Sequence, residues 1–130
     1  MSIGVTLEVK GLQELQKKLQ SEVALKPFHE GIKRATLLLQ REVMMATVVD
    51  TGRLRASITP KLAEGFGQVG TNVEYASVIE FGSDKFPARH MEGGTKVLGE
   101  GMFAFGLRKL TDKMKELLGD VANAIEAKWK

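Results

Sequence analysis

The chain has 130 residues, of which 43% are hydrophobic and 27% are charged, and this size and composition fit one small domain with a modest core. It contains no cysteine, which excludes disulfides and thiolate metal sites, and no apolar run approaches the ~20 residues that cross a bilayer. The charges of its 19 basic and 16 acidic residues nearly cancel, and it has one Trp and one Tyr. A surface that reads nucleic-acid sequence is therefore not indicated. We therefore expect a soluble single domain over residues 1–130, made in a cytoplasm and without a membrane segment.

The first part of the chain predicts a strand followed by two helices. Apolar and polar residues alternate over residues 3–9, which is the pattern of a half-buried strand. Leucines at helical spacing begin at Leu12, and Pro27 is expected to break or restart that helix. From Phe28 to about Ala46 a continuous apolar stripe predicts a long helix that packs across a sheet.

The middle of the chain predicts a turn, a short helix and a hairpin. Asp50-Thr51-Gly52 has the composition of a turn or helix cap before a short helical turn at residues 53–57. Residues 58–63 and 67–71 predict a β-hairpin. Pro60 places the first of these strands at an edge of the sheet, because proline cannot donate a ladder hydrogen bond.

A second short helix follows the hairpin and leads into a long loop. Tyr75 and Ile79 lie on one side of this helix, which Gly82 ends. Glu74 and Glu80 flank Tyr75 and are expected to be surface charges. Residues 83–101 contain four glycines and one proline, and they predict a flexible, functional loop with room for a small hairpin around Thr95 to Leu98.

The C-terminal part has the clearest helical pattern in the chain. From Leu107 to Ile125, apolar residues recur at spacings of three and four, which predicts one long amphipathic helix. Phe103 and Phe105 are expected to anchor its beginning on the core. Together these elements predict an α+β fold, with a small, mostly antiparallel sheet packed by a long helix and a second long helix at the C-terminus.

Asp50-Thr51-Gly52 also matches the short site of dimeric aspartic proteases, in which carboxylates from two subunits share a proton. Arg53 stands where those enzymes need a small residue, and a long helix precedes the match, so a turn or cap is favoured. His29 and His90 lie far apart and lack the spacing of metal ligands. A small dimeric aspartic protease using Asp50 and a weak DNA-binding module stay open as alternatives. We expect no cofactor and no metal.

Three blocks in the middle of the chain resemble a known family. The segment from Val49 to Ile58 reads VDTGRLRASI, Val69 to Asn72 reads VGTN, and Tyr75 to Gly82 reads YASVIEFG. In this order and spacing they are similar to the minor virion proteins of the head–tail neck of tailed bacteriophages, which are described as tail-completion or head–tail joining proteins. The loop departs from the usual family ending, because residues 92–101 look like an insertion after a partial match at residues 86–91.

The resemblance implies a structural protein without an active site. Such a protein forms a ring, six- or twelvefold, that joins the connector or head-closure protein to the tail terminator or tail tube. DNA passes through the lumen without being read. It resides in the virion, and in the host cytoplasm during assembly.

The resemblance also implies roles for particular residues. Asp50 and Thr51 would cap a turn. Gly52 and Gly82 would adopt backbone geometries that a side chain would block. Four side chains of the short helix would pack it against the sheet: Tyr75, Val78, Ile79 and Phe81. Partner contacts are expected in the loop, at Asp84, Lys85, Phe86, Arg89, His90, Met91, Lys96 and Leu98.

Overall fold

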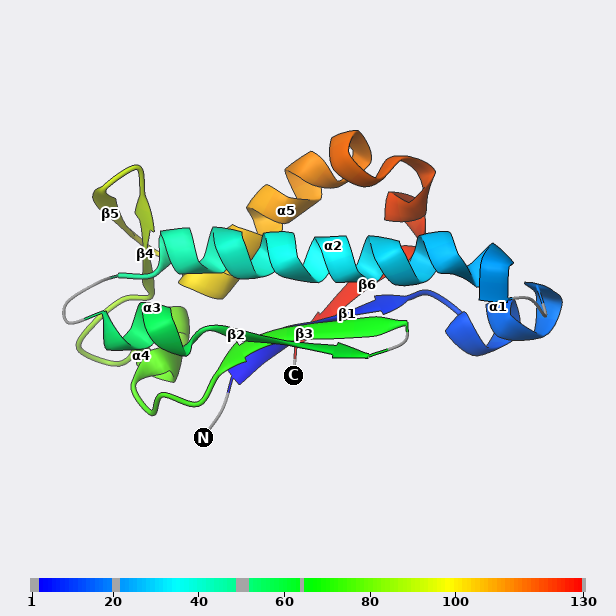
Figure 1. The fold of residues 1–130 in the computed structure, drawn as a ribbon. Helices are drawn as coiled ribbons and strands as arrows, with labels where there is room; N and C mark the ends of the chain where they lie inside the picture. The colour runs from blue at the N-terminus through cyan, green and yellow to red at the C-terminus, as the bar shows by residue number, and fades with distance from the viewer. Residues whose placement is uncertain (1–2, 20–21, 49–51, 64, 130) are drawn as a thin grey trace.

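A computed structural model describes residues 3–19, 22–48, 52–63 and 65–129 and confirms the α+β class (Figure 1). Helices and strands alternate irregularly along the chain. Their bounds in chain order are β1 Ile3–Val9, α1 Leu12–Leu19, α2 Glu22–Ala46, α3 Arg53–Ser57, β2 Thr59–Ala63, β3 Phe66–Thr71, α4 Ala76–Phe81, β4 Arg89–Glu92, β5 Thr95–Leu98, α5 Met102–Leu118, the 3-10 helix η1 Gly119–Ala124 and β6 Ile125–Trp129.

The main sheet has four strands in the order β2-β3-β1-β6, and every neighbouring pair is antiparallel. Val5 of β1 lies opposite Val69 of β3 on one side and opposite Trp129 of β6 on the other. Because side chains alternate between the faces of a strand, Val5 and Leu7 point to the same face, and both are buried there. The edge position predicted from Pro60 is confirmed, since β2 is an outer strand.

Helix α2 crosses the buried face of the sheet, and α5 packs beside it (Figure 1). Leu39 of α2 and Phe103 and Leu110 of α5 are fully buried in the resulting core. Each such side chain contributes on the order of 1.5–3 kcal/mol through its removal from water. Helix α2 lies so close to β3 that a side chain at Gly67 would collide with Thr36. This contact fixes α2 against the strand that leads into α4.

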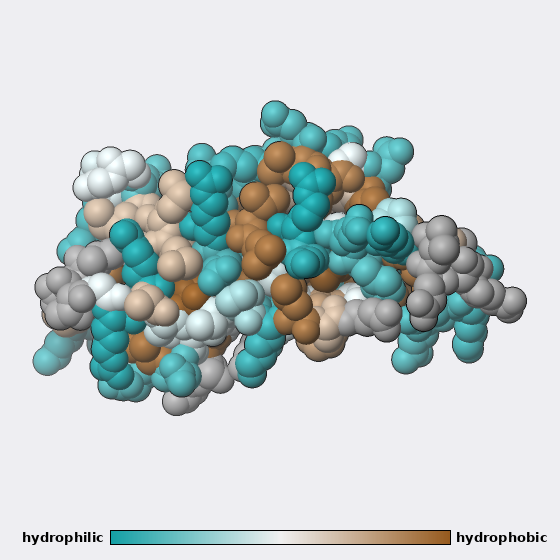
Figure 2. Space-filling model, viewed as in Figure 1, coloured by the Kyte–Doolittle hydropathy of each residue, from teal (hydrophilic) through white to brown (hydrophobic). Residues whose placement is uncertain are grey.

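The opposite face of the sheet is polar. Gln68 donates a hydrogen bond to Thr6 at 3.2 Å, and Lys128 pairs with Glu8 at 3.3 Å. On the side of the molecule shown in Figure 2, hydrophilic side chains predominate, and hydrophobic ones gather in separate patches. Among the residues that the structure describes, no helix has both the length and the apolar character needed to cross a membrane.

Pro27 lies inside α2, so the prediction that it would break or restart the helix is wrong. A proline beyond the first turn removes one backbone hydrogen bond and crowds the carbonyl four residues before it, at a cost of about 3 kcal/mol. Leu25 and Ile32, on either side of Pro27, are buried, and their packing holds the helix together across that position.

The C-terminal helix is shorter than predicted. Helix α5 ends at Leu118 because Gly119 adopts φ 61°, a left-handed value that favours glycine. The chain continues as η1 and then as β6, which pairs with β1. Val121 of η1 is partly buried against the core. The apolar repeat from Leu107 to Ile125 therefore predicted the burial of this side chain correctly, although the backbone there is a 3-10 helix. Strand β6 was not predicted.

Residues 83–100 form a projecting segment that we call the arm. Its centre is an antiparallel hairpin of β4 and β5 joined by Gly93 and Gly94, which is consistent with the small hairpin predicted around Thr95 to Leu98. The backbone N–H of Gly99 donates to the carbonyl of Ala88 at 2.8 Å and closes the base of the hairpin. In Figure 1 the hairpin lies at the end of the molecule where α2 finishes.

Candidate functional site

The described parts of the three motif blocks come together as one scaffold that leads into the arm. Ser57 at the end of α3 and Thr71 at the end of β3 have hydroxyl oxygens 2.6 Å apart. Ser57 donates to the carbonyl of Leu54 at 2.6 Å, while Thr71 accepts the backbone N–H of Val73 at 3.1 Å. Thr71 therefore acts as donor to Ser57, and the chain of hydrogen bonds ties α3 to the segment that enters α4.

The same scaffold holds the C-terminal end of α2. Arg55 donates from Nε to the carbonyl of Met44 at 2.9 Å and from its guanidinium to the carbonyl of Thr47 at 3.4 Å. The last carbonyls of a helix lack partners within the helix, so a guanidinium at this position satisfies them. Arg53 pairs with Glu74 on the surface at 3.4 Å, a contact that contributes little in water.

Helix α4 is buried through fewer side chains than predicted. Ile79 is buried, but Phe81 is 63% exposed and Tyr75 is 36% exposed, so the prediction that these two aromatic rings bury the helix is wrong. Phe81 instead contacts Trp129 at the end of β6, with ring centroids 5.7 Å apart. Since sequence reasoning did not find β6, it also missed this aromatic pair.

Gly82 ends α4 and turns the chain into the arm, as predicted. Its φ of 79° is left-handed, and its N–H donates to the carbonyl of Val78 at 2.8 Å. A side chain at this position would also lie 2.8 Å from the backbone nitrogen of Ala88, because the arm returns past it. Both the backbone angle and the close approach therefore require glycine here.

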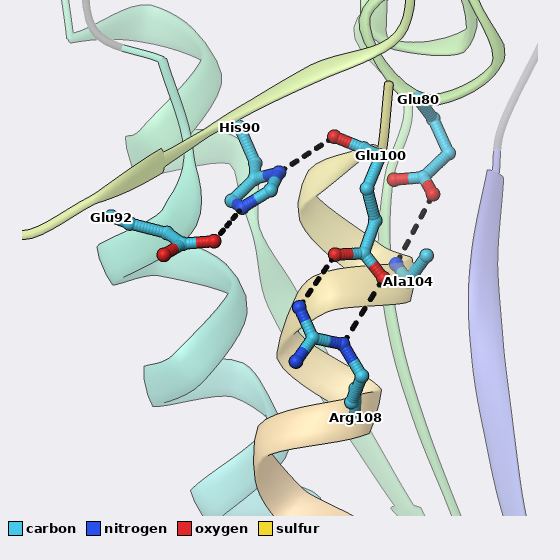
Figure 3. Close-up of polar contacts among 6 residues, drawn as sticks. All are labelled: Glu80, His90, Glu92, Glu100, Ala104 and Arg108. Atoms are coloured by element: carbon cyan, nitrogen blue, oxygen red, sulfur yellow. Dashed lines mark hydrogen bonds and ion pairs between the residues drawn. The ribbon is translucent and has the colours of Figure 1, made fainter. Parts of the chain in front are cut away.

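Glu80 is the anchor between α4 and α5, and the prediction that it is a surface charge is wrong (Figure 3). It is 4% exposed, and its carboxylate accepts the backbone N–H groups of Phe103 at 2.6 Å and Ala104 at 3.1 Å. Helix α5 begins after Gly101 with no cap from its own first residues, so Glu80 caps it from another element. Burial raises the pKa of the Glu80 carboxyl, and the two backbone hydrogen bonds oppose that rise.

A sequence signal for this anchor exists in α4. Ala76 and Ile79 are its buried apolar residues, and Glu80 is four positions after Ala76, so all three share one helical face. A carboxylate on the buried face of a short helix needs a hydrogen-bonding partner. Which backbone amides supply that partner depends on the placement of α5.

His90 is buried under the hairpin and bonds to Glu92 and Glu100 (Figure 3). It is 1% exposed, lies 2.7 Å from the carbonyl oxygen of Glu100 and 2.9 Å from a carboxylate oxygen of Glu92, and stacks on the ring of Phe105 at 4.1 Å. Both polar partners accept hydrogen bonds, so a ring nitrogen that carries a hydrogen donates to its partner. The burial of His90 removes it from the exposed contact surface on which it was predicted.

Glu100 closes the arm at its C-terminal side. Its carboxylate accepts two hydrogen bonds from Arg108, at 2.8 and 3.3 Å, in a bidentate arrangement (Figure 3). The hydrogen bond and charge of Arg108 lower the pKa of Glu100. The guanidinium also lies 5.1 Å from the centre of the Phe105 ring, so Phe105 has His90 and Arg108 as neighbours. The arm is thus attached at both of its ends.

The other predicted contact residues lie on the arm in different environments. Phe86 and Leu98 are 58% and 61% exposed, so both present apolar surface to solvent. Arg89 lies over the Phe86 ring at 5.9 Å. The remaining predicted residues are Asp84, Lys85 and Lys96, which are exposed, and Met91, which is partly buried.

Comparison with protein-family models identifies the family of this scaffold. Residues 9–82 match the family described as "Bacteriophage HK97-gp10, putative tail-component". The chain belongs to the HK97-gp10-like family. Comparisons with curated proteins and with solved structures gave no significant match.

Membership of the HK97-gp10-like family makes the chain a structural component of a phage tail and gives it a place in the virion. The match begins at the end of β1 and stops at Gly82, so it contains the scaffold of α3, β3 and α4. It does not extend over the arm or α5.

The family does not favour the protease alternative. Asp50 and Thr51 lie outside the described residues, so their predicted role as a cap stays a prediction. Gly52 precedes α3 directly and has φ 83°. Within the described part of the chain, no group of three or more His, Asp or Glu side chains is placed to hold a metal ion.

Proposed function

We propose that this chain is a subunit of the head–tail junction, where it forms a ring between the connector or head-closure protein and the tail terminator or tail tube. Its membership of a family of phage tail components supports a place in the particle. The observation that carries the proposal is the anchored arm, which presents Phe86 and Leu98 to solvent from a base held by Glu80 and His90. A surface of this kind is suited to a protein partner.

The ring would let the genome pass without holding it. The formal net charge is +3 at pH 7, with basic and acidic residues nearly in balance. Each phosphate contact by a Lys or Arg side chain adds to salt-sensitive affinity, so a surface of mixed charge slows DNA less than a strongly basic one. On this proposal the DNA contacts are not sequence-specific.

The arm would be the part that contacts neighbours, and residues 1–130 would act as one domain. We propose that the arm is more flexible before assembly than the scaffold and becomes ordered on docking, at a cost in conformational entropy that the new contacts offset. The chain would fold in the host cytoplasm before it enters the particle.

The proposal is tested by supplying the chain to particles that lack it. Replacing Phe86 and Leu98 together with serine is expected to lower the yield of joined heads and tails in negative-stain images while circular dichroism stays unchanged. Leu62→Ser is the matched control, since Leu62 is an exposed leucine, 45% accessible, on the edge strand β2. A wild-type chain that stays monomeric in native mass spectrometry and never joins particles contradicts the proposal.

A further inference from the structure

A groove of about 430 Å³ lies at the end of the molecule opposite the arm. It is bounded by the beginning of α1, the turn between β2 and β3, and β6. Figure 1 shows the separation: α1 lies at one end of α2, and the β4–β5 hairpin lies at the other. The arm of a chain therefore does not reach its own groove.

The groove has apolar and acidic components. Leu12 is half-buried in its lining, and Phe66 is 41% exposed there, so an apolar surface faces the groove. Three carboxylates also line it: Glu8, Glu14 and Glu126. Among the described residues that line the groove, the one cation is Lys128, whose Nζ lies 3.3 Å from Glu8 and 3.7 Å from Glu126. Negative charge is therefore in excess around an apolar surface.

The arm has the complementary properties. Its exposed apolar side chains are Phe86 and Leu98, and basic side chains lie close to them in sequence: Lys85, Arg89 and Lys96. Among the described residues, the ion pairs of the structure include none of these three cations. The arm also holds three carboxylates: Asp84, Glu92 and Glu100. Glu92 contacts His90 and Glu100 pairs with Arg108, so two of these three charges have partners within the same chain. An apolar surface with basic neighbours thus matches an apolar surface with acidic neighbours.

We propose that the arm of one copy docks in the acidic groove of the next copy, and that this contact, repeated head to tail, builds the ring. The inference rests on the proposed function and specifies which two surfaces of the chain meet between neighbouring copies in the ring. Two different surfaces at opposite ends of one chain make a heterologous contact, which generates a closed ring when the rotation between copies closes. Salt is expected to weaken the contact, because its charges lie near solvent.

Cysteine cross-linking tests the contact directly, since the natural chain contains no cysteine. A variant carrying Thr95→Cys in the arm and Gln13→Cys in the groove is expected to form a ladder of cross-linked species under mild oxidation, up to the size of the ring. The matched control combines Thr95→Cys with Glu116→Cys on the exposed side of α5 and is expected to stop at the dimer. Both variants are examined as purified chains at high concentration and in assembled particles.

Charge reversal tests the chemistry of the contact. In the cross-linking variant, Lys96→Glu is expected to lower the ladder yield about tenfold, which corresponds to a single unfavourable charge contact. Adding Glu14→Lys is expected to restore most of the yield. A ladder no stronger than the control in both preparations overturns the inference, and so does failure of the second reversal to restore it.

The outcomes for the inference and for the proposed function are distinguishable. If particles join normally and contain the chain but no arm–groove ladder forms, the arm contacts another protein and only the inference is overturned. If the chain is absent from joined particles and particles join without it, the proposed function is overturned as well.

Discussion

Both ends of helix α2 are packed by buried apolar side chains, and at the C-terminal end directional polar contacts are added to the packing of Val43 and Ala46. At the C-terminal end, the carbonyls of Met44 and Thr47 accept hydrogen bonds from Arg55, and Glu42 pairs with Lys113 at 2.7 Å. Towards the other end, Leu25 and Ile32 are buried. The end with these polar contacts is also the end that carries the arm.

This difference explains how the arm is positioned. Apolar packing stabilises any arrangement that removes the same surface from water, whereas a hydrogen bond requires a particular distance and direction. Glu80 joins α4 to α5 through such bonds, His90 joins β4 to Glu100, and Glu100 joins the end of the arm to α5. The position of the arm is therefore fixed by the distances and directions of hydrogen bonds as well as by apolar packing. Variants that remove one kind of contact at a time separate the two contributions.

Removing the apolar core should have the largest effect. Phe103→Ala is expected to lower the free energy of unfolding by about 4 kcal/mol, because it leaves a cavity at a fully buried ring. Urea unfolding followed by circular dichroism measures the loss. Phe81→Ala, at an exposed ring, is the control and should cost less than about 1 kcal/mol. Equal losses in the two variants would contradict the described core.

Removing the buried cap should have the next largest effect. Glu80→Ala is expected to cost about 2 kcal/mol, because two backbone amides of α5 lose a charged acceptor while the cost of burying that charge is relieved. Hydrogen exchange at Phe103 and Ala104 should accelerate more than exchange elsewhere in α5. Glu74→Ala, on the surface of the same region, should change stability by less than about 0.5 kcal/mol. Unchanged exchange at both amides would show that the cap is not formed.

Loosening the arm should have a smaller and more local effect. His90→Ala removes two polar contacts and the stack on Phe105, and it is expected to cost about 1 kcal/mol in global stability. Exchange of the amides in β4 and β5 should rise about tenfold, while amides of β1 keep their protection. His29→Ala, at the other histidine, is the comparison variant. A uniform rise across the whole chain would mean that His90 supports the core instead of the arm.

The pH dependence of the Glu80 cap should be the smallest of these effects. The pKa of Glu80 in the folded chain is raised above its ordinary value of 4.5. A raised carboxyl pKa contributes stability that is fully present below the unfolded value and is lost as pH rises through the folded value. The wild-type chain should therefore lose stability relative to Glu80→Gln as pH rises above 4.5, which urea unfolding at a series of pH values measures. An opposite slope would show that the backbone hydrogen bonds outweigh burial.

Local patterns predicted much of this fold. Alternation over residues 3–9 predicted β1, the glycine after Phe81 predicted the end of α4, and Pro60 predicted an edge strand, because each pattern reports the surroundings of a single element. The spacing of the motif blocks also pointed to the family that the chain matches. The glycines of residues 83–101 and their lack of periodicity predicted a loop with room for a small hairpin, and the structure contains the hairpin of β4 and β5 there.

The sequence by itself thus determined the fold class, most of the elements and the family. Only the tertiary structure decided that Ile125–Trp129 is a strand, that Glu80 caps α5, and that His90 is buried beneath the arm. In each case the partner is distant in the chain: β1 for the strand, the first amides of α5 for Glu80, and the Phe105 ring for His90. A polar side chain carries the same local signal in water and in a buried hydrogen bond, so its role is set by the packing that brings its partner to it.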